Sequence, residues 1–258
     1  MKHKSISEEL RGALDRGELF LEYLPTVMLG DSHCVGGEAL VRWRRNREVL
    51  HAEAFIPMIE NTPVSGTLTY WVLDTVATEL GEWLGANSEA HISINVPPEI
   101  LGRGGLAYVA SRTGLCDHLK QIVLEITERG VPDRLGLDAL NLMAQNGIRV
   151  ALDDVMMSGA NVALLTRCNF SMIKLDRELI AQLTPDKPLP EWFSGLRELL
   201  KQTQLHVVAE GVTSAHQARV LNAIGVQMAQ GYFYSAGLTA SALMAFYRGA
   251  HGLGGGLH

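Results

Sequence analysis

The sequence predicts an α/β fold, a TIM-like (β/α)8 barrel with one antiparallel strand. Short apolar runs alternate with longer segments of helical period, and the alternation gives eight strands within 258 residues. This pattern favours a closed barrel over an open doubly wound sheet. Only the short turn MLGDSH separates the first two runs, so we expect them to form a hairpin that introduces the antiparallel strand.

The expected strands are short apolar runs, and the expected helices are the periodic segments between them. The strands span residues 19–27, 34–43, 90–96, 121–127, 148–154, 171–176, 205–212 and 226–234. Four segments place apolar residues at three- and four-residue spacings, namely 67–84, 134–147, 191–203 and 214–225. We expect these four to be helices that cover the sheet.

The chain is expected to form one domain. No low-complexity linker divides it, and its most loop-like internal stretch is residues 184–190. With 47% hydrophobic residues it can bury one large core. We therefore expect a single barrel domain over residues 1–250, followed by a flexible tail over residues 251–258.

Charge and cysteine content exclude several classes of function. A formal net charge of -6 argues against binding a nucleic-acid polymer, because such proteins displace counterions with Lys and Arg. The polar start and the lack of an apolar stretch of about eighteen residues predict a cytoplasmic protein without membrane contact. The cysteines, Cys34, Cys116 and Cys168, are odd in number and lack a CxxC pair. We expect buried thiols rather than disulfides or zinc ligands.

Polar residues stand at the ends of the expected strands, at the rim where barrels of this class carry their chemistry. They are Glu38, Asn95, Glu125, Asp153, Asp154, Lys174, Glu210 and Gln230. One carboxylate at a strand end is usually a helix cap or a loop anchor. Five in one ring would repel, by roughly 4 kcal/mol for a pair about 4 Å apart at an effective dielectric near 20. One lysine cannot balance five, so the ring predicts bound cations.

Oxygen ligands without thiolate or imidazole favour magnesium, manganese or calcium over zinc or copper. Adjacent aspartates fit a two-metal site, with Asp153 bridging both ions and Asp154 on the second, which would activate water and clamp a phosphoryl group. Other roles stay open. Asp154 could cap a following helix, Lys174 could be a counter-ion for Asp153 or Asp176, and Arg42 could belong to a solvated basic edge.

Five short motifs occur in order and at suitable separations. They are GGEALVRW (36–43), DD (153–154), IKLDRELI (173–180), VVAEGV (207–212) and QGYFYS (230–235). Through them the chain resembles the EAL domain family from about residue 18 to residue 240. The resemblance implies a TIM-like barrel with one reversed strand and a bacterial, cyclic-guanylate-specific phosphodiesterase that opens cyclic di-GMP to linear pGpG. It also implies Mg²⁺ or Mn²⁺ as cofactor, Ca²⁺ as inhibitor, a homodimer, and regulation by partners or sensory domains outside the chain.

The same resemblance assigns roles to individual positions. The first-metal ligands are Glu38, Asn95, Glu125 and Asp153, and the second-metal positions are Asp154 and Glu210. The catalytic set is Lys174, Glu210 and Asp154, with Lys174 positioning the attacking water. The substrate-binding positions are Arg42, Leu40 and Gln230, with Arg42 on a phosphate. Glu128 matches a glutamate that anchors the loop after the aspartate pair.

The chain also departs from the family pattern. The loop over residues 155–161 belongs to DDVMMSGAN, where active members read like DDFGTGYSS, and Thr213 replaces a second glutamate. Leu24 replaces the glutamine of YQP, and SAG at 235–237 replaces SRP.

Our leading hypothesis is a metal-dependent phosphodiesterase that uses two-metal activation of water. The alternatives are a catalytically weak or inactive receptor for cyclic di-GMP, and a protein-interaction module that binds no nucleotide.

Overall fold

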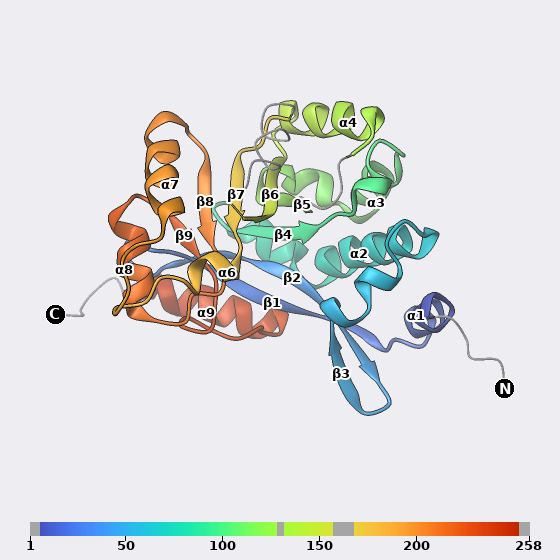
Figure 1. The fold of residues 1–258 in the computed structure, drawn as a ribbon. Helices are drawn as coiled ribbons and strands as arrows, with labels where there is room; N and C mark the ends of the chain where they lie inside the picture. The colour runs from blue at the N-terminus through green and yellow to red at the C-terminus, as the bar shows by residue number, and fades with distance from the viewer. Residues whose placement is uncertain (1–5, 128–131, 157–167, 253–258) are drawn as a thin grey trace.

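The strands close into a mixed barrel in the computed structural model, which describes residues 6–127, 132–156 and 168–252 (Figure 1). The barrel strands are β1 (Leu19–Met28), β2 (Cys34–Arg45), β4 (His91–Asn95), β5 (Ile122–Thr127), β6 (Arg149–Val155), β7 (Met172–Leu175), β8 (His206–Ala209) and β9 (Met228–Ala229). Neighbours follow the order β1-β9-β8-β7-β6-β5-β4-β2, and pairing of β1 with β2 closes the circle. Strand β1 is antiparallel to both β2 and β9, whereas the other barrel pairs are parallel. The predicted fold class is therefore confirmed.

A ninth strand, β3 (Glu48–His51), was not predicted. It pairs antiparallel with the end of β2, and the two form a hairpin that projects from the barrel (Figure 1). Its two turn residues, Asn46 and Arg47, have φ of 49° and 71°, the left-handed conformation of a tight type I′ turn. Arginine is not a turn signal in a sequence, which explains why the hairpin was missed.

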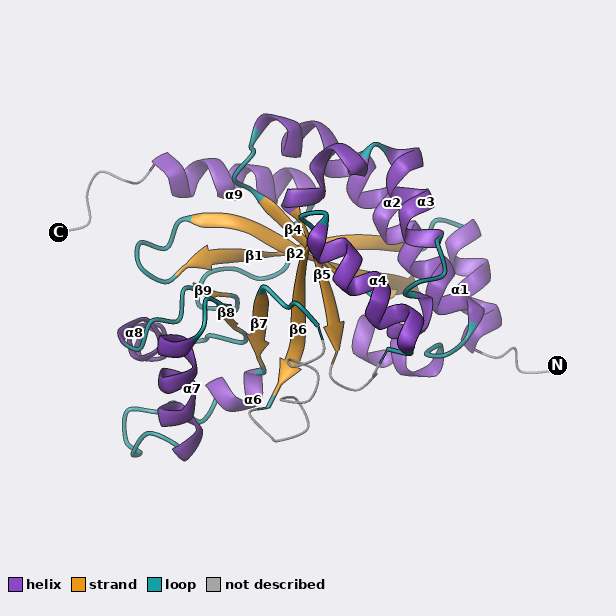
Figure 2. Cartoon of the chain, turned by 90° about the horizontal axis from the view of Figure 1, so that it is seen from above, coloured by secondary structure: helices purple, strands orange, loops and turns teal. Residues whose placement is uncertain are grey.

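Helices surround the strands when the chain is seen from above (Figure 2). They are α1 (Ile6–Asp15), α2 (Pro63–Ala86), α3 (Gly105–Thr113), α4 (Arg134–Gln145), α6 (Arg177–Ile180), α7 (Glu191–Gln202), α8 (Ala215–Ala223) and α9 (Ala240–Gly252). Short 3-10 turns span Ala52–Ala54, Ile56–Met58, Pro98–Ile100 and Leu115–Gln121. The four predicted helices correspond to α2, α4, α7 and α8, and the other four helices of the described ranges were not predicted.

Capping residues explain where three of these helices begin. The Thr62 hydroxyl accepts from Val64 N ahead of α2, and the Asp133 carboxylate accepts from Gly136 N at 2.9 Å ahead of α4. Ser214 and Gln217 form a reciprocal capping box at α8. Each cap satisfies backbone N–H groups that have no partner inside the helix.

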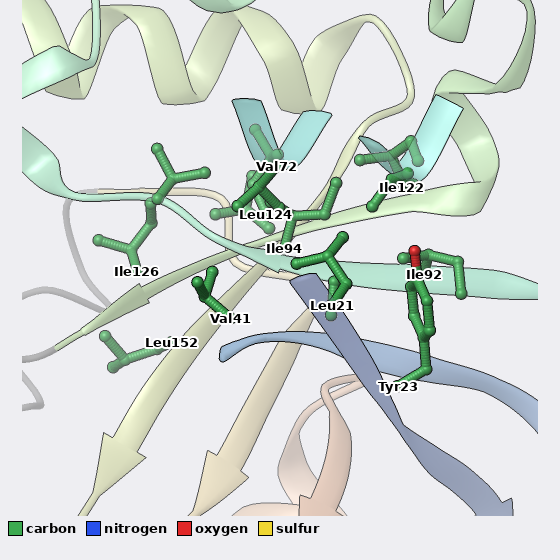
Figure 3. Close-up of a cluster of buried hydrophobic side chains, with 14 of the residues drawn as sticks. Leu21, Tyr23, Val41, Val72, Ile92, Ile94, Ile122, Leu124, Ile126 and Leu152 are labelled. Atoms are coloured by element: carbon green, nitrogen blue, oxygen red, sulfur yellow. The ribbon is translucent and has the colours of Figure 1, made fainter. Parts of the chain in front are cut away.

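The main hydrophobic core lies between the barrel and the helices. Strand side chains that point outward pack there, and Figure 3 shows Ile94 and Leu124 beside Val72 of α2. A second, smaller cluster comprises Val123, Ala151, Met172, Val208 and Met228. Burial of aliphatic side chains of this size stabilises a fold by about 1.5 to 3 kcal/mol each.

This smaller cluster fixes which way the polar rim points. Along a strand, residues two apart share a face. Glu125, Asp153, Lys174, Glu210 and Gln230 each lie two positions after a member of the cluster. The polar side chains therefore stand on the same face of their strands as the apolar cluster, one layer further toward the carboxyl ends.

The expectation of buried cysteine thiols is confirmed for two of the three cysteines. Cys34 and Cys168 are buried free thiols as expected, whereas Cys116 is exposed, so the expectation of buried thiols was wrong for Cys116. It follows Leu115 in a 3-10 turn, and Leu115 takes the buried position instead.

In the part of the chain that is described, no helix has both the length and the apolar character to span a membrane. The division into a domain over 1–250 and a tail over 251–258 stays a prediction.

Candidate functional site

The ammonium group of Lys174 is the centre at which the rim carboxylates meet. Its Nζ lies 2.9 Å from Glu38 Oε2, 2.9 Å from Glu125 Oε2, 3.3 Å from Asp153 Oδ1 and 2.5 Å from Glu210 Oε1. The Lys174 side chain is only 2% exposed. Glu38 comes from the interior of β2, Glu125 and Asp153 come from β5 and β6, and Glu210 directly follows β8. One buried cation is therefore shared by strands from around the barrel.

The backbone holds these side chains in place even where the strands have ended. Glu210 N donates to Leu175 O at 3.1 Å, and Gln230 N donates to Ala209 O at 2.9 Å. Each bond continues the parallel pairing by one residue past the strand end. Glu210 and Gln230 are therefore fixed at the rim, although the predicted strands 205–212 and 226–234 are much shorter in the structure.

Burial is the largest influence on the pKa of each of the four acids that contact Lys174. It raises the pKa of Glu125 well above its ordinary value, with the Glu38 carboxylate adding to the rise. It also raises the pKa of Asp153, and it raises the pKa of Glu210 to about 8 against the opposing charge of Lys174. At Glu38 burial also acts upward, but the nearby Lys174 ammonium and its hydrogen bond outweigh it and lower the pKa.

Lys174 itself stays charged. Burial acts to lower its pKa, but the surrounding carboxylates, Asp153 first among them, raise the pKa well above the ordinary value. One positive charge faces four acids, so the ring cannot be fully ionised without further positive charge. Protons on the acids or added cations must supply it.

A bulge in β6 lets two consecutive aspartates serve the site. The β6–β7 register runs from Leu152 opposite Ile173 to Val155 opposite Leu175, so Asp153 and Asp154 both stand opposite Lys174 alone. Asp154 has φ of 55°, a left-handed conformation that aspartate tolerates better than most residues. An ordinary strand would send neighbouring side chains to opposite faces, whereas here both face the rim.

Asp153, Asp154 and Glu210 form the group best arranged to hold a metal ion among the described residues. Each offers a carboxylate oxygen, and these oxygens lie within 4.8 Å of one another. In addition, Glu125 Oε1 is buried and has no hydrogen-bond partner within the described part of the chain. A buried acceptor without a donor is costly, and a cation would satisfy it. The donor set therefore fits a divalent ion that prefers oxygen.

Asn95 and Gln230 occupy different parts of the rim. Asn95 Nδ2 donates to Glu38 Oε1 at 2.9 Å, which joins it to the Lys174 cluster. Gln230 Nε2 donates to Thr26 Oγ1 at 2.9 Å, and its buried Oε1 has no partner among the described residues. Thr26 was not predicted as part of the site, since the sequence does not show that β1 pairs with β9.

Arg42 is buried and does not belong to a solvated basic edge. It is only 6% exposed, its Nε donates to Glu22 Oε2 at 2.7 Å, and its Nη1 donates to Val41 O at 3.0 Å. Leu40, half-buried, precedes it by two residues and lies opposite Glu22 in the β1–β2 register. Sequence reasoning missed Glu22, and only the register of the hairpin could have revealed it.

The structure also shows which of the two aspartates proposed as partners Lys174 contacts. Asp176 accepts from Glu178 N at 2.6 Å and caps α6, whereas Lys174 contacts Asp153 and three glutamates. The counter-ion role toward Asp153 is therefore present, and the role toward Asp176 was wrong because that carboxylate binds the helix start instead. Asp154 lies within β6, and its alternative role as a helix cap is untested because residues 157–167 are outside the described ranges.

Other expected features fall partly outside the described residues. Glu128 is outside them, as is most of the loop 155–161. Thr213 is exposed, and both its backbone N–H and its hydroxyl bind Gln217 Oε1, at 2.8 Å and 3.2 Å. Thr213 thus belongs to the start of α8 and adds no carboxylate to the ring.

The fold and the ring together define a TIM-like barrel protein with an acidic site at the carboxyl ends of its parallel strands. The chain belongs to the EAL domain family, whose model matches residues 7–236.

Its relatives include proteins with named activities. The chain is 27% identical over 241 residues to the probable cyclic di-GMP phosphodiesterase PdeB of Escherichia coli, which covers 91% of this chain and 46% of that protein. It is 29% identical over 244 residues to MucR of Pseudomonas aeruginosa, named a bifunctional diguanylate cyclase/cyclic di-GMP phosphodiesterase, covering 92% of this chain and 36% of that protein. The chain thus spans less than half the length of these relatives.

Solved structures agree with the fold. A structure described as the PaMucR phosphodiesterase in complex with c-di-GMP matches with a TM-score of 0.82 and 27% identity, covering 93% of this chain and 100% of that chain. The EAL domain of DcpA from Mycobacterium smegmatis matches with a TM-score of 0.72 and 25% identity, covering 90% of this chain and 98% of that chain.

Proposed function

We propose that this chain is a metal-dependent phosphodiesterase that hydrolyses cyclic di-GMP to linear pGpG. The observation that carries the proposal is the convergence of Glu38, Glu125, Asp153 and Glu210 on one buried lysine at the carboxyl end of the barrel. Membership of the EAL domain family and the activities named for its relatives PdeB and MucR support the choice of reaction and substrate.

The oxygen donors of the ring are the proposed metal ligands. We assign Glu38, Asn95, Glu125 and Asp153 to one ion and Asp154 with Glu210 to a second, with Asp153 shared. Oxygen donors of this kind favour Mg²⁺ or Mn²⁺, and Ca²⁺ is proposed to inhibit. When bound, such ions screen the phosphate charge and lower the pKa of water toward neutrality.

The chain's own side chains would then bind and orient the reactants. The three N–H donors of Lys174 face carboxylates in this structure. Once metal ions take up these carboxylates, Lys174, held charged by its neighbours, would donate a hydrogen bond to the attacking water and fix its position. Arg42 can hold a phosphate oxygen through its guanidinium group. Leu40 and Gln230 are the proposed contacts with the rest of the substrate, and Glu128 is the proposed anchor of the loop after Asp154.

Three proposals concern the surroundings of this domain. We propose a homodimer, a cytoplasmic location, and regulation by partners or sensory domains outside this chain. Cyclic di-GMP is the proposed ligand, with neither a nucleic-acid polymer nor a membrane as partner. The acidic net charge of -6 supports the exclusion of polymers.

Product analysis tests the leading proposal. Purified protein is incubated with cyclic di-GMP and Mg²⁺ or Mn²⁺, and linear pGpG is separated by chromatography. Glu38→Ala should abolish product, whereas Glu60→Ala, at an exposed position outside the ring, should retain wild-type activity. Absence of pGpG from the wild-type protein at high concentration would reject the proposal.

A receptor that binds cyclic di-GMP without turnover is the second candidate. It is favoured by Thr213, which places no carboxylate near the ring and instead binds Gln217. Calorimetry in Ca²⁺ separates the two, because binding without hydrolysis in Mg²⁺ or Mn²⁺ indicates a receptor. Failure to bind under any metal condition indicates a protein-interaction module instead.

A further inference from the structure

The guanidinium group of Arg42 is fixed by two acceptors of the protein itself. Its Nε donates to Glu22 Oε2 at 2.7 Å and its Nη1 donates to Val41 O at 3.0 Å. The arginine side chain is 8% exposed and that of Glu22 is 29% exposed. A guanidinium has five N–H donors in a planar fork. Three of them, both on Nη2 and one on Nη1, take no part in these two bonds.

The hairpin register brings Glu22 to this place. In the antiparallel β1–β2 pair, Phe20 stands opposite Arg42 and Glu22 stands opposite Leu40. Glu22 and Arg42 are thus diagonal neighbours on one face of the hairpin, close enough for long side chains to meet. Glu38 shares that face of β2, four residues before Arg42. The Glu22–Arg42 ion pair therefore lies on the same face of β2 as Glu38 of the carboxylate ring, further along the strand.

Gly237 provides the space that the Glu22 carboxylate occupies. A Cβ atom at position 237 would lie 2.8 Å from Glu22 Oε2 and 3.2 Å from Glu22 Cβ. The segment cannot easily move away, because Tyr23 N donates to Leu238 O at 2.7 Å and Leu238 N donates to Tyr23 O at 2.8 Å. The backbone of Gly237 is not left-handed, and the three atoms nearest to an alanine Cβ there would all belong to Glu22.

The contact between Gly237 and Glu22 explains one departure from the family pattern. The pattern has SRP where this chain has SAG at 235–237, and a proline at position 237 would carry the Cβ atom that collides with Glu22. The glycine and the glutamate are therefore matched to each other. Together they leave Arg42 with a carboxylate partner at Nε.

We propose that Glu22 is a positioning residue for substrate binding, which orients Arg42 so that its three remaining N–H groups face the phosphate, and that Gly237 makes this contact possible. The inference rests on the proposed function. An arginine held in advance loses less conformational freedom when a phosphate binds. The negative charge of Glu22 also repels the phosphate, but its partial exposure to water screens that repulsion. For substrate affinity, the gain from holding Arg42 in place is thus larger than the loss from this repulsion.

Steady-state kinetics with cyclic di-GMP test this role. Glu22→Ala should raise KM about tenfold with kcat nearly unchanged, which is the loss expected for one charge-assisted hydrogen bond that acts in binding. Glu22→Gln keeps an acceptor oxygen for Nε and should restore most of the affinity. Gly237→Ala should raise KM in the same direction, because its methyl group displaces the Glu22 carboxylate.

A double-mutant cycle shows whether Glu22 acts through Arg42. Adding Glu22→Ala to Arg42→Ala should change KM by less than about twofold, since the group being positioned is gone. Glu60→Ala is the surface control. The inference is overturned if Glu22→Ala leaves KM unchanged, if it lowers KM, or if it reduces only thermal stability. An inactive wild type would instead reject the proposed function. If that protein still binds cyclic di-GMP in Ca²⁺, the same variants are compared by Kd in calorimetry, with an unchanged Kd in Glu22→Ala overturning the inference; if it binds none, the inference is rejected as well.

Discussion

The Nζ atom of Lys174 lies 2.9 Å from Glu125 Oε2, and both side chains are almost completely buried. This pair joins β7 to β5 across the end of the barrel, and three more acids share the same ammonium group. Lys174 therefore holds together strands that are not neighbours in the sheet.

Replacing Lys174 with methionine is expected to destabilise the metal-free protein. The change leaves four buried acids without their cation, and breaking a buried ion pair by removing one partner costs about 3 to 5 kcal/mol. Urea denaturation at pH 8 with a chelator measures the free energy of unfolding. Mn²⁺ should restore part of the loss, because an ion that binds only the folded state stabilises it. Lys187→Met, on the surface, is the control, and equal stabilities of the two variants would contradict the central role of Lys174.

The backbone of Asp154 gives a second prediction. Its φ of 55° suits asparagine about as well as aspartate, whereas alanine is strained there by about 1 kcal/mol. Asp154→Asn and Asp154→Ala both remove the carboxylate, so both should bind Mn²⁺ more weakly in calorimetry. Only the alanine variant should also lose stability in urea denaturation. If the two variants are equally stable, the bulge does not depend on the left-handed conformation.

Much of the fold could be predicted from the sequence because each barrel strand is a local pattern. The eight apolar runs and the short first turn were enough to identify the barrel and its reversed strand. Helix α1 was missed because its sequence is mostly polar, although Leu10 and Ala13 are buried. The β2–β3 hairpin was missed because its turn uses Arg47 in a conformation that arginine rarely adopts.

The site residues that lie near strand ends could be predicted from the sequence. The contacts that depend on how β1 is aligned with β2 could not. Glu125, Asp153 and Lys174 come together because each lies near the carboxyl end of a parallel strand, so reading the strand ends was sufficient. Glu22 reaches Arg42 only through the exact alignment of β1 with β2. A sequence does not state that alignment, and so it did not reveal that Arg42 already has a carboxylate partner.

Acid stability should depend on His91. Burial, together with the nearby Arg149 and His206, lowers the pKa of His91 to about 3. The unfolded chain takes up this proton at an ordinary histidine pKa near 6.5, so the neutral histidine contributes fully above that pH. The contribution is lost as pH falls toward 3, and it amounts to about 5 kcal/mol for a shift of this size.

The variant His91→Gln isolates this effect. Its free energy of unfolding should fall less steeply between pH 6.5 and pH 4 than that of the wild type, because no buried imidazole must be protonated on unfolding. His51→Gln, at an exposed position of β3, should keep the wild-type slope. Parallel pH profiles for His91→Gln and the wild type would show that other groups cause the acid loss.

Gly36 should tolerate no side chain, and this affects the site two residues later. Gly36 pairs with His91 in the β2–β4 register and has φ of 151°. A Cβ atom there would lie 1.9 Å from His91 O, so Gly36→Ala must separate the two strands. We expect a loss of at least about 3 kcal/mol in unfolding free energy, in the range of severe packing defects, with weaker Mn²⁺ binding because Glu38 moves with β2.

Gly30→Ala, where a Cβ atom would meet nothing within 4 Å, should change stability by less than about 0.5 kcal/mol. Wild-type stability in Gly36→Ala would mean that β2 and β4 do not approach as closely as this contact requires.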